Sequence, residues 1–124
     1  MQLGRNVVYE SWGRPTDPGG CKGPYNDRSP VRRLTIQLLV TNNSDQLTQD
    51  MWFPEFYTAT GAHPPSCIWY YNNTVISPHE TVDVTFATHV EVGDYVQTMR
   101  LDVLGHSVTI TLDPSGNEIG RSYQ

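Results

Sequence analysis

The stretch that decides the fold is Leu34-Thr35-Ile36-Gln37-Leu38-Leu39-Val40-Thr41, where aliphatic residues occupy every second position. Side chains alternate between the two faces of a β-strand, so this spacing turns one row toward a core and the other toward solvent. The same period of two recurs at residues 81–86, 98–103 and 107–112. Such strands predict antiparallel sheets packed on one side, because parallel strands buried on both faces would read as continuous apolar runs.

Length and composition extend this pattern to the whole chain. The 124 residues match one compact domain, residues 1–124. Thr (13) and Val (12) are abundant while Ala (3) and Lys (1) are scarce, so strand formers replace helix formers. Weaker strand patterns lie at residues 6–12, 52–60, 66–71 and 118–123. We therefore expect an all-β fold, an antiparallel β-sandwich of seven or eight strands.

Turn residues separate these strands. Polar clusters follow the first strong strand at residues 42–45 and precede the second at 77–80, and Leu104-Gly105-His106 is short enough to make a hairpin. Asp113-Pro114-Ser115-Gly116 is typical of a type I turn, although its oxygen atoms would also suit calcium. Asn42-Asn43-Ser44 and Asn72-Asn73-Thr74 fit the N-glycosylation pattern.

A Gly/Pro-rich loop at residues 13–30 interrupts the regular spacing. It holds four Gly and four Pro, and a loop of this length in a compact domain is usually functional or mobile. It also holds Cys21, one of only two cysteines; the other is Cys67. A Cys21–Cys67 disulfide would add about 2–4 kcal/mol in an oxidising compartment. Two unrelated free thiols are the alternative, since Cα atoms more than ~7 Å apart cannot be joined without backbone movement.

Charge is distributed unevenly along the chain. Residues 1–33 carry a net charge of +3, whereas residues 34–99 carry −7 and contain no Lys or Arg. Duplex nucleic acid is bound by clustered cations, so we expect no nucleic acid partner. The basic third can fold back onto the acidic body of its own chain. Alternatively, it can dock on a neighbouring copy in a head-to-tail assembly.

Three short pieces carry a resemblance to a known family. Val40-Thr41-Asn42-Asn43-Ser44, Phe56-Tyr57-Thr58-Ala59-Thr60-Gly61 and Ile76-Ser77-Pro78-His79-Glu80-Thr81, the last leading into Phe86, resemble the telokin-like immunoglobulin-fold domains of unknown function found in bacterial lipoproteins and secreted proteins. The likeness covers roughly residues 34–112. His79 stands where that family usually has Gly, and the loop at 13–30 has no counterpart. The resemblance implies an immunoglobulin-like sandwich outside the cytoplasm that makes contacts and performs no catalysis.

No residue pattern points to a catalytic centre. The chain has no Gly-x-Ser-x-Gly elbow and no phosphate-binding Gly loop, and its histidines and cysteines match no metal-ligand spacing. Glu55 and Asp83 could form a carboxylate pair if they share a face. We expect no catalytic residues, no cofactor and no metal. A metal-binding protein or metal-dependent enzyme, built on His63, His79, His89, His106 and the two cysteines, is kept as an alternative.

Large aromatic residues concentrate on two neighbouring predicted strands, residues 52–60 and 66–71, so rings must appear on both faces of that hairpin. Either Trp52, Phe56 and Trp69 build the core while tyrosines cap its edge, or the exposed rings form a contact surface, since Tyr and Trp are enriched at interface hot spots. The surface that we predict consists of Phe53, Tyr57, Trp69, Tyr70 and Tyr71.

These observations predict a non-catalytic interaction module, used for binding or adhesion, with a protein or glycan partner or through self-association. The alternative is a structural assembly subunit of a filament or virion surface with charge-complementary self-contacts. We expect no membrane insertion, because a spanning helix needs about 20 apolar residues and the longest aliphatic run here is Leu38-Leu39-Val40. The chain shows no secretory signal, so it is either cytoplasmic or extracellular with a signal removed before Met1. The second location is the one expected.

Overall fold

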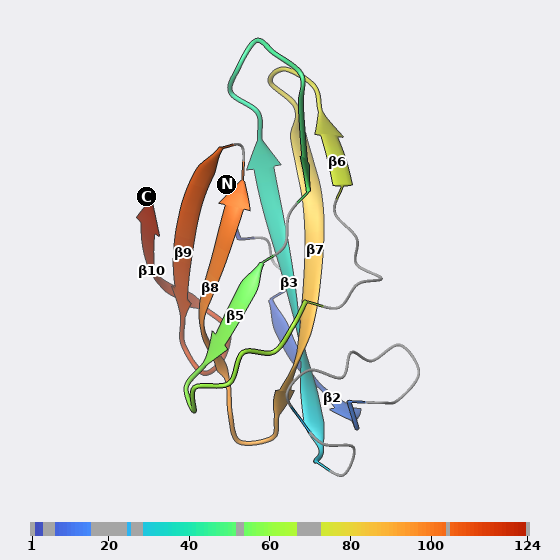
Figure 1. Ribbon diagram of the computed structural model, residues 1–124, viewed down its shortest axis with the longest axis vertical. Helices are drawn as coiled ribbons and strands as arrows, with labels where there is room; N and C mark the ends of the chain where they lie inside the picture. The colour runs from blue at the N-terminus through green and yellow to red at the C-terminus, as the bar shows by residue number, and fades with distance from the viewer. Residues whose placement is uncertain are drawn as a thin grey trace.

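The computed structural model describes residues 2–3, 7–15, 25, 29–51, 54–66, 73–103 and 105–123 (Figure 1). These ranges contain no helix. They hold ten strand segments: β1 (Gln2–Leu3), β2 (Val8–Gly13), β3 (Val31–Thr41), β4 (Thr48–Met51), β5 (Glu55–Thr58), β6 (Asn73–Ile76), β7 (Thr81–Glu91), β8 (Val96–Val103), β9 (His106–Leu112) and β10 (Glu118–Tyr123).

The strands form two antiparallel sheets and one short pair. In the first sheet β3 is central: it pairs with β7 over its whole length, and with β1 and β2 along its other edge. The second sheet has the order β10-β9-β8-β5, and β4 pairs with β6. Figure 1 shows the long β3 and β7 side by side, with the second sheet as a separate layer. The predicted all-β antiparallel sandwich is therefore confirmed.

The core lies between the two sheets and follows the period of two. On β3 the aliphatic side chains at alternate positions from Leu34 to Val40 are all buried. They meet the buried rows of the second sheet, which are formed by Met99 and Leu101 of β8 and by alternate residues of β9. Phe56 and Phe86 are the largest fully buried side chains. Burial of this apolar surface is the main favourable contribution to folding.

Asn42 organises the end of the sandwich where β3 stops. Its side chain is buried, and its amide nitrogen donates to the carbonyl oxygens of Gln46 (2.8 Å) and Ile76 (3.2 Å). Its amide oxygen accepts bonds from Ser44 Oγ (2.7 Å) and N (3.1 Å). The first N-glycosylation pattern thus falls on an asparagine whose side-chain amide is engaged inside the protein, so Asn42-Asn43-Ser44 is a structural motif and not an accessible acceptor.

The neighbouring turn places His79, a residue other than glycine, in a left-handed backbone conformation. This residue has φ of 61°, in the left-handed region that glycine adopts most readily. Its backbone N–H donates to the Asn42 carbonyl oxygen (2.7 Å), and its ring nitrogen lies 2.9 Å from Asp45 Oδ1. The two exposed loops at this end are joined by these contacts. The position requires a left-handed backbone, and the chain provides it with a histidine.

Two predicted turns occur at the expected places. Val103 pairs with His106 across the β8–β9 hairpin, where Gly105 has φ of 77°. In the turn between β9 and β10 the Gly116 N–H donates to the Asp113 carbonyl oxygen (2.9 Å). The Asp113 carboxylate accepts the backbone N–H groups of Ser115 and Asn117, both at 2.9 Å. These bonds, with that of Asn117 first among them, lower the pKa of Asp113 and account for the turn-forming residues.

The predicted aromatic hairpin lies largely outside the described residues, because residues 67–72 of its second strand are not among them. Its first strand is present as β5, which is shorter than the predicted 52–60 and pairs with β8. That pairing depends on long-range packing, and alternation in the sequence carries no information about it.

Candidate functional site

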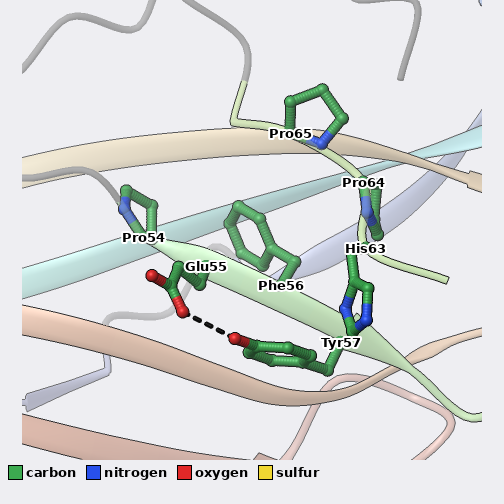
Figure 2. Close-up of a pocket in the computed structure, with 7 residues that line it drawn as sticks. All are labelled: Pro54, Glu55, Phe56, Tyr57, His63, Pro64 and Pro65. Carbon is green, nitrogen blue, oxygen red and sulfur yellow. Dashed lines mark hydrogen bonds between the residues drawn. The ribbon is translucent and has the colours of Figure 1, made fainter. Parts of the chain in front are cut away.

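An open groove of about 380 Å³ lies along β5, at the edge of the second sheet. Figure 2 shows Pro54 and the Pro64–Pro65 pair on opposite sides of Phe56, and shows Tyr57 next to both Glu55 and His63. Within the described part of the chain, the lining residues come from β5, from the residue before it and from the segment after it: Pro54, Glu55, Phe56, Tyr57, His63, Pro64 and Pro65.

The alternation of β5 separates the groove from the core. Phe56 is fully buried, whereas Glu55 is exposed and Tyr57 is partly exposed. Residues two positions apart point to the same face of a strand, so the carboxylate and the phenol lie side by side on the outer face. On β8, Arg100 is opposite Glu55 and Thr98 is opposite Tyr57.

A tight turn after β5 brings residues 63–65, which form the second wall of the groove, back beside the strand. The Thr58 N–H donates to the Ala62 carbonyl oxygen (2.9 Å), and Gly61 provides the positive φ of 89° that the reversal needs. The wall is also held at its far end, because Thr88 Oγ1 on β7 donates to the Pro65 carbonyl oxygen (2.8 Å). In Figure 1 this segment crosses from β5 toward β7. The groove therefore spans the edge between the two sheets.

Asp94 fixes the turn that carries this wall. Its buried carboxylate accepts bonds from Thr60 Oγ1 (2.6 Å) and from the Tyr95 N–H (2.9 Å), and Arg32 donates to its backbone carbonyl oxygen. Burial raises the pKa of Asp94, but the bonds donated by Thr58, Thr60 and Tyr95 favour the ionised form and together hold that pKa below its usual value. The Asp94 carboxylate thus holds the turn after β5, and its backbone carbonyl oxygen connects the same residue to Arg32 of β3.

Three side chains in the groove are in mutual contact. The Tyr57 hydroxyl donates to Glu55 Oε2 at 2.6 Å, and this bond is the first cause of a raised pKa for Tyr57 because it stabilises the protonated phenol. The rings of Tyr57 and His63 meet edge to face, with centroids 4.6 Å apart and an interplanar angle of 83°. These contacts hold the Glu55 carboxylate and the His63 imidazole next to the Tyr57 ring.

The groove presents polar groups beside apolar ones. Glu55 and His63 are both exposed. Proline has no N–H, so the three prolines contribute apolar rings and no backbone donors, and the Pro65 carbonyl oxygen already accepts a hydrogen bond from Thr88. Among the described residues, the groove therefore combines an aromatic ring and a carboxylate with apolar walls.

Of the predicted contact surface, Tyr57 lies in the groove. Phe53, Trp69, Tyr70 and Tyr71 fall outside the described residues, as do Cys21 and Cys67, and the disulfide remains a prediction. Glu55, His63 and the prolines were not predicted to belong to the surface. The fold brings the Pro64-Pro65 pair, which follows Gly61, back along β5.

The alternative with a carboxylate pair is wrong, because Glu55 and Asp83 do not share a face. Glu55 points outward from the second sheet, whereas Asp83 of β7 is exposed on the first sheet and accepts a hydrogen bond from Gln37. The histidines are also dispersed: His79 lies in the end loops, His89 is buried on β7 and His63 lines the groove. Within the described ranges, no three His, Cys, Asp or Glu residues are grouped to hold a metal.

Two cations of the basic N-terminal third are used inside the fold. The Arg32 guanidinium carbon lies 4.3 Å from the centroid of the Tyr9 ring, and that of Arg33 lies 3.9 Å from the Trp12 ring. Arg33 is also buried. The guanidinium groups of these two residues therefore already have ring contacts within the chain. Lys22 and Arg28, in the loop at 13–30, fall outside the described residues, as does Arg5.

Comparison with protein-family models, with curated proteins and with solved structures finds no match for this chain. The described residues contain no helix long and apolar enough to span a bilayer.

Proposed function

We propose that the protein is a non-catalytic interaction module that contacts a partner through the groove beside β5. The observation that carries this proposal is the pre-ordered set of Tyr57, Glu55 and His63 in an open groove walled by prolines. Binding sites typically combine apolar walls with a few placed polar groups. Action outside the cytoplasm and an immunoglobulin-like relationship are part of the same proposal, supported by the resemblance at residues 34–112.

A protein partner is favoured over a glycan. The groove residues belong to a stretch of the sequence, positions 34 to 99, that carries seven acidic residues and no Lys or Arg, and Arg100 lies opposite Glu55 in the strand pair. Charge of one sign in a partner site attracts ligands of the opposite sign and raises their association rate. A neutral sugar would gain nothing from this charge, whereas a basic peptide segment would.

The test is selection from a random peptide library displayed on phage, with the intact protein immobilised. We expect enriched peptides whose binding is lost with Tyr57→Ala. Tyr123→Ala is the matched control, because Tyr123 is an exposed tyrosine at the opposite edge of the same sheet. No enrichment, or enriched peptides that bind the Tyr57→Ala protein as well as the wild type, would refute a peptide-binding groove. A glycan array run in parallel reports on the glycan alternative.

A further inference from the structure

The protein recognises arginine within its own fold in a repeated way. Arg32 places its guanidinium over the Tyr9 ring and donates to the Asp94 carbonyl oxygen, so one group uses an aromatic face and an oxygen acceptor together. The guanidinium of Arg33 likewise lies over a ring, with its carbon 3.9 Å from the centroid of Trp12. Planar guanidinium groups favour such sites because they stack on rings while donating hydrogen bonds in their own plane.

The groove contains the same arrangement without its cation. Tyr57 supplies the ring, and Glu55 supplies an exposed carboxylate that is already oriented by the Tyr57 hydroxyl. The edge-to-face contact with His63 can occupy at most one face of the Tyr57 ring. In the described part of the chain Glu55 forms no ion pair, even with Arg100 directly across the strand pair. The Tyr57 ring and the Glu55 carboxylate thus lie together, and in the described residues no cation is paired with that carboxylate.

We propose that this groove binds the guanidinium group of an arginine side chain presented by a partner protein. The proposal rests on the function proposed above and names its ligand. The ring of Tyr57 stacks against the guanidinium, Glu55 accepts its N–H groups, and the proline walls pack against the aliphatic stem. A donor-rich ligand suits a groove in which the Glu55 carboxylate accepts hydrogen bonds and the prolines contribute no N–H.

Arginine fits this site better than lysine. Its planar fork matches a carboxylate in two-point contact and is more weakly hydrated than an ammonium group, so it loses less on entering a half-apolar groove. The chain's own Arg100 lies next to Glu55 as the nearest competing cation. Removing the charge of Arg100 should therefore strengthen binding, while removing the charge of Glu55 should weaken it.

The experiment titrates the intact protein with the peptide acetyl-Gly-Arg-Gly-amide and follows backbone NMR shifts of residues 54–66. The matched probe carries citrulline, which keeps the shape of arginine and lacks its charge. We expect the arginine peptide to bind at least tenfold more tightly than the citrulline peptide, and more tightly than its lysine counterpart. Glu55→Gln should remove the preference for arginine, and Arg100→Gln should increase affinity several-fold.

Asp102→Asn is the control variant, because Asp102 is an exposed carboxylate on the adjacent strand and its charge should not matter. Equal binding of the arginine and citrulline peptides would overturn the proposal, as would an unchanged preference in Glu55→Gln. Sedimentation of the free protein is measured alongside. Oligomers that Glu55→Gln dissociates would place a second copy in the groove and overturn assignment to another protein. If display selection succeeds while arginine fails, the groove binds peptides and only the ligand class is wrong.

Discussion

Replacing Asn42 by alanine should destabilise the protein far more than an average polar substitution. The side chain is 2% exposed and makes at least three good hydrogen bonds: two from its amide nitrogen to the carbonyl oxygens of Gln46 and Ile76, and one to its amide oxygen from Ser44 Oγ. Each such bond contributes about 1 kcal/mol net, so Asn42→Ala should cost about 3 kcal/mol. Because these bonds join the loop after β3 to the turn before β7, the loss falls on the end of the sandwich.

The assay is urea unfolding followed by circular dichroism, with thermal melting as a second measurement. A loss of about 3 kcal/mol corresponds to a fall of about 10 °C in the melting temperature of a domain of this size. Asn43→Ala is the matched control: it removes the same chemical group from the exposed next residue and should change stability by less than about 0.5 kcal/mol.

A second variant separates the donor bonds from the rest of the side chain. Asn42→Asp retains the oxygen that Ser44 contacts but turns a carboxylate oxygen toward the Ile76 carbonyl, so it should cost at least as much as alanine. The reasoning would be refuted if Asn42→Ala lost less than about 1 kcal/mol, or if the variants at positions 42 and 43 were equally stable.

Three further outcomes are expected. Gly116→Ala should be more destabilising than Gly93→Ala. Both glycines have positive φ, but an added Cβ at 116 would lie 2.9 Å from Val7 Cγ1, whereas an added Cβ at 93 would have no atom within 4 Å. Equal melting temperatures of the two variants would contradict this prediction. The pKa of Asp94 is lower in the folded protein than in the unfolded chain, so the Asp94 carboxylate stabilises the fold above the unfolded value of about 3.9, and this stabilisation is lost as the pH falls below it. The melting temperature of Asp94→Asn should therefore depend less on pH between about 2 and 4 than that of the wild type. Intact mass before and after denaturation, without reductant, should show a Cys21–Cys67 bridge as a deficit of two hydrogen masses; a full mass would indicate free thiols.

The strand pattern could be predicted from the sequence to the extent that it depends on local alternation. Residues 34–41 lie within β3 and the last predicted strand coincides with β10, while the predicted 81–86 extends to Glu91 as β7. The reason for the last difference is tertiary. Ala87 and His89 alternate with core-facing residues, yet both are buried, so the outer face is covered at this end and simple alternation of polar and apolar residues breaks down.

A bulge in β2 explains part of the burial of this outer face of β7. The register shifts between Ser11 and Gly13, and Trp12 packs 5.7 Å from the ring of His89 and against the Arg33 guanidinium. Bulges re-aim a side chain by adding a residue to one strand, and nothing in the sequence around Trp12 marks the position. His89 could therefore be read as a strand residue but not as a buried one.

The groove likewise combines features that follow from the local sequence with features that depend on tertiary packing. The antiparallel β-sandwich could be predicted from the sequence alone, because the spacing of apolar residues dictates which side chains leave water. The same pattern placed Tyr57 on a strand. The pairing of β5 with β8, the return of His63 to the Tyr57 ring by the Gly61 turn and the contact between Thr88 and Pro65 were evident only in the folded structure. Those contacts join residues that are distant along the chain, and their geometry is set by how the two sheets pack.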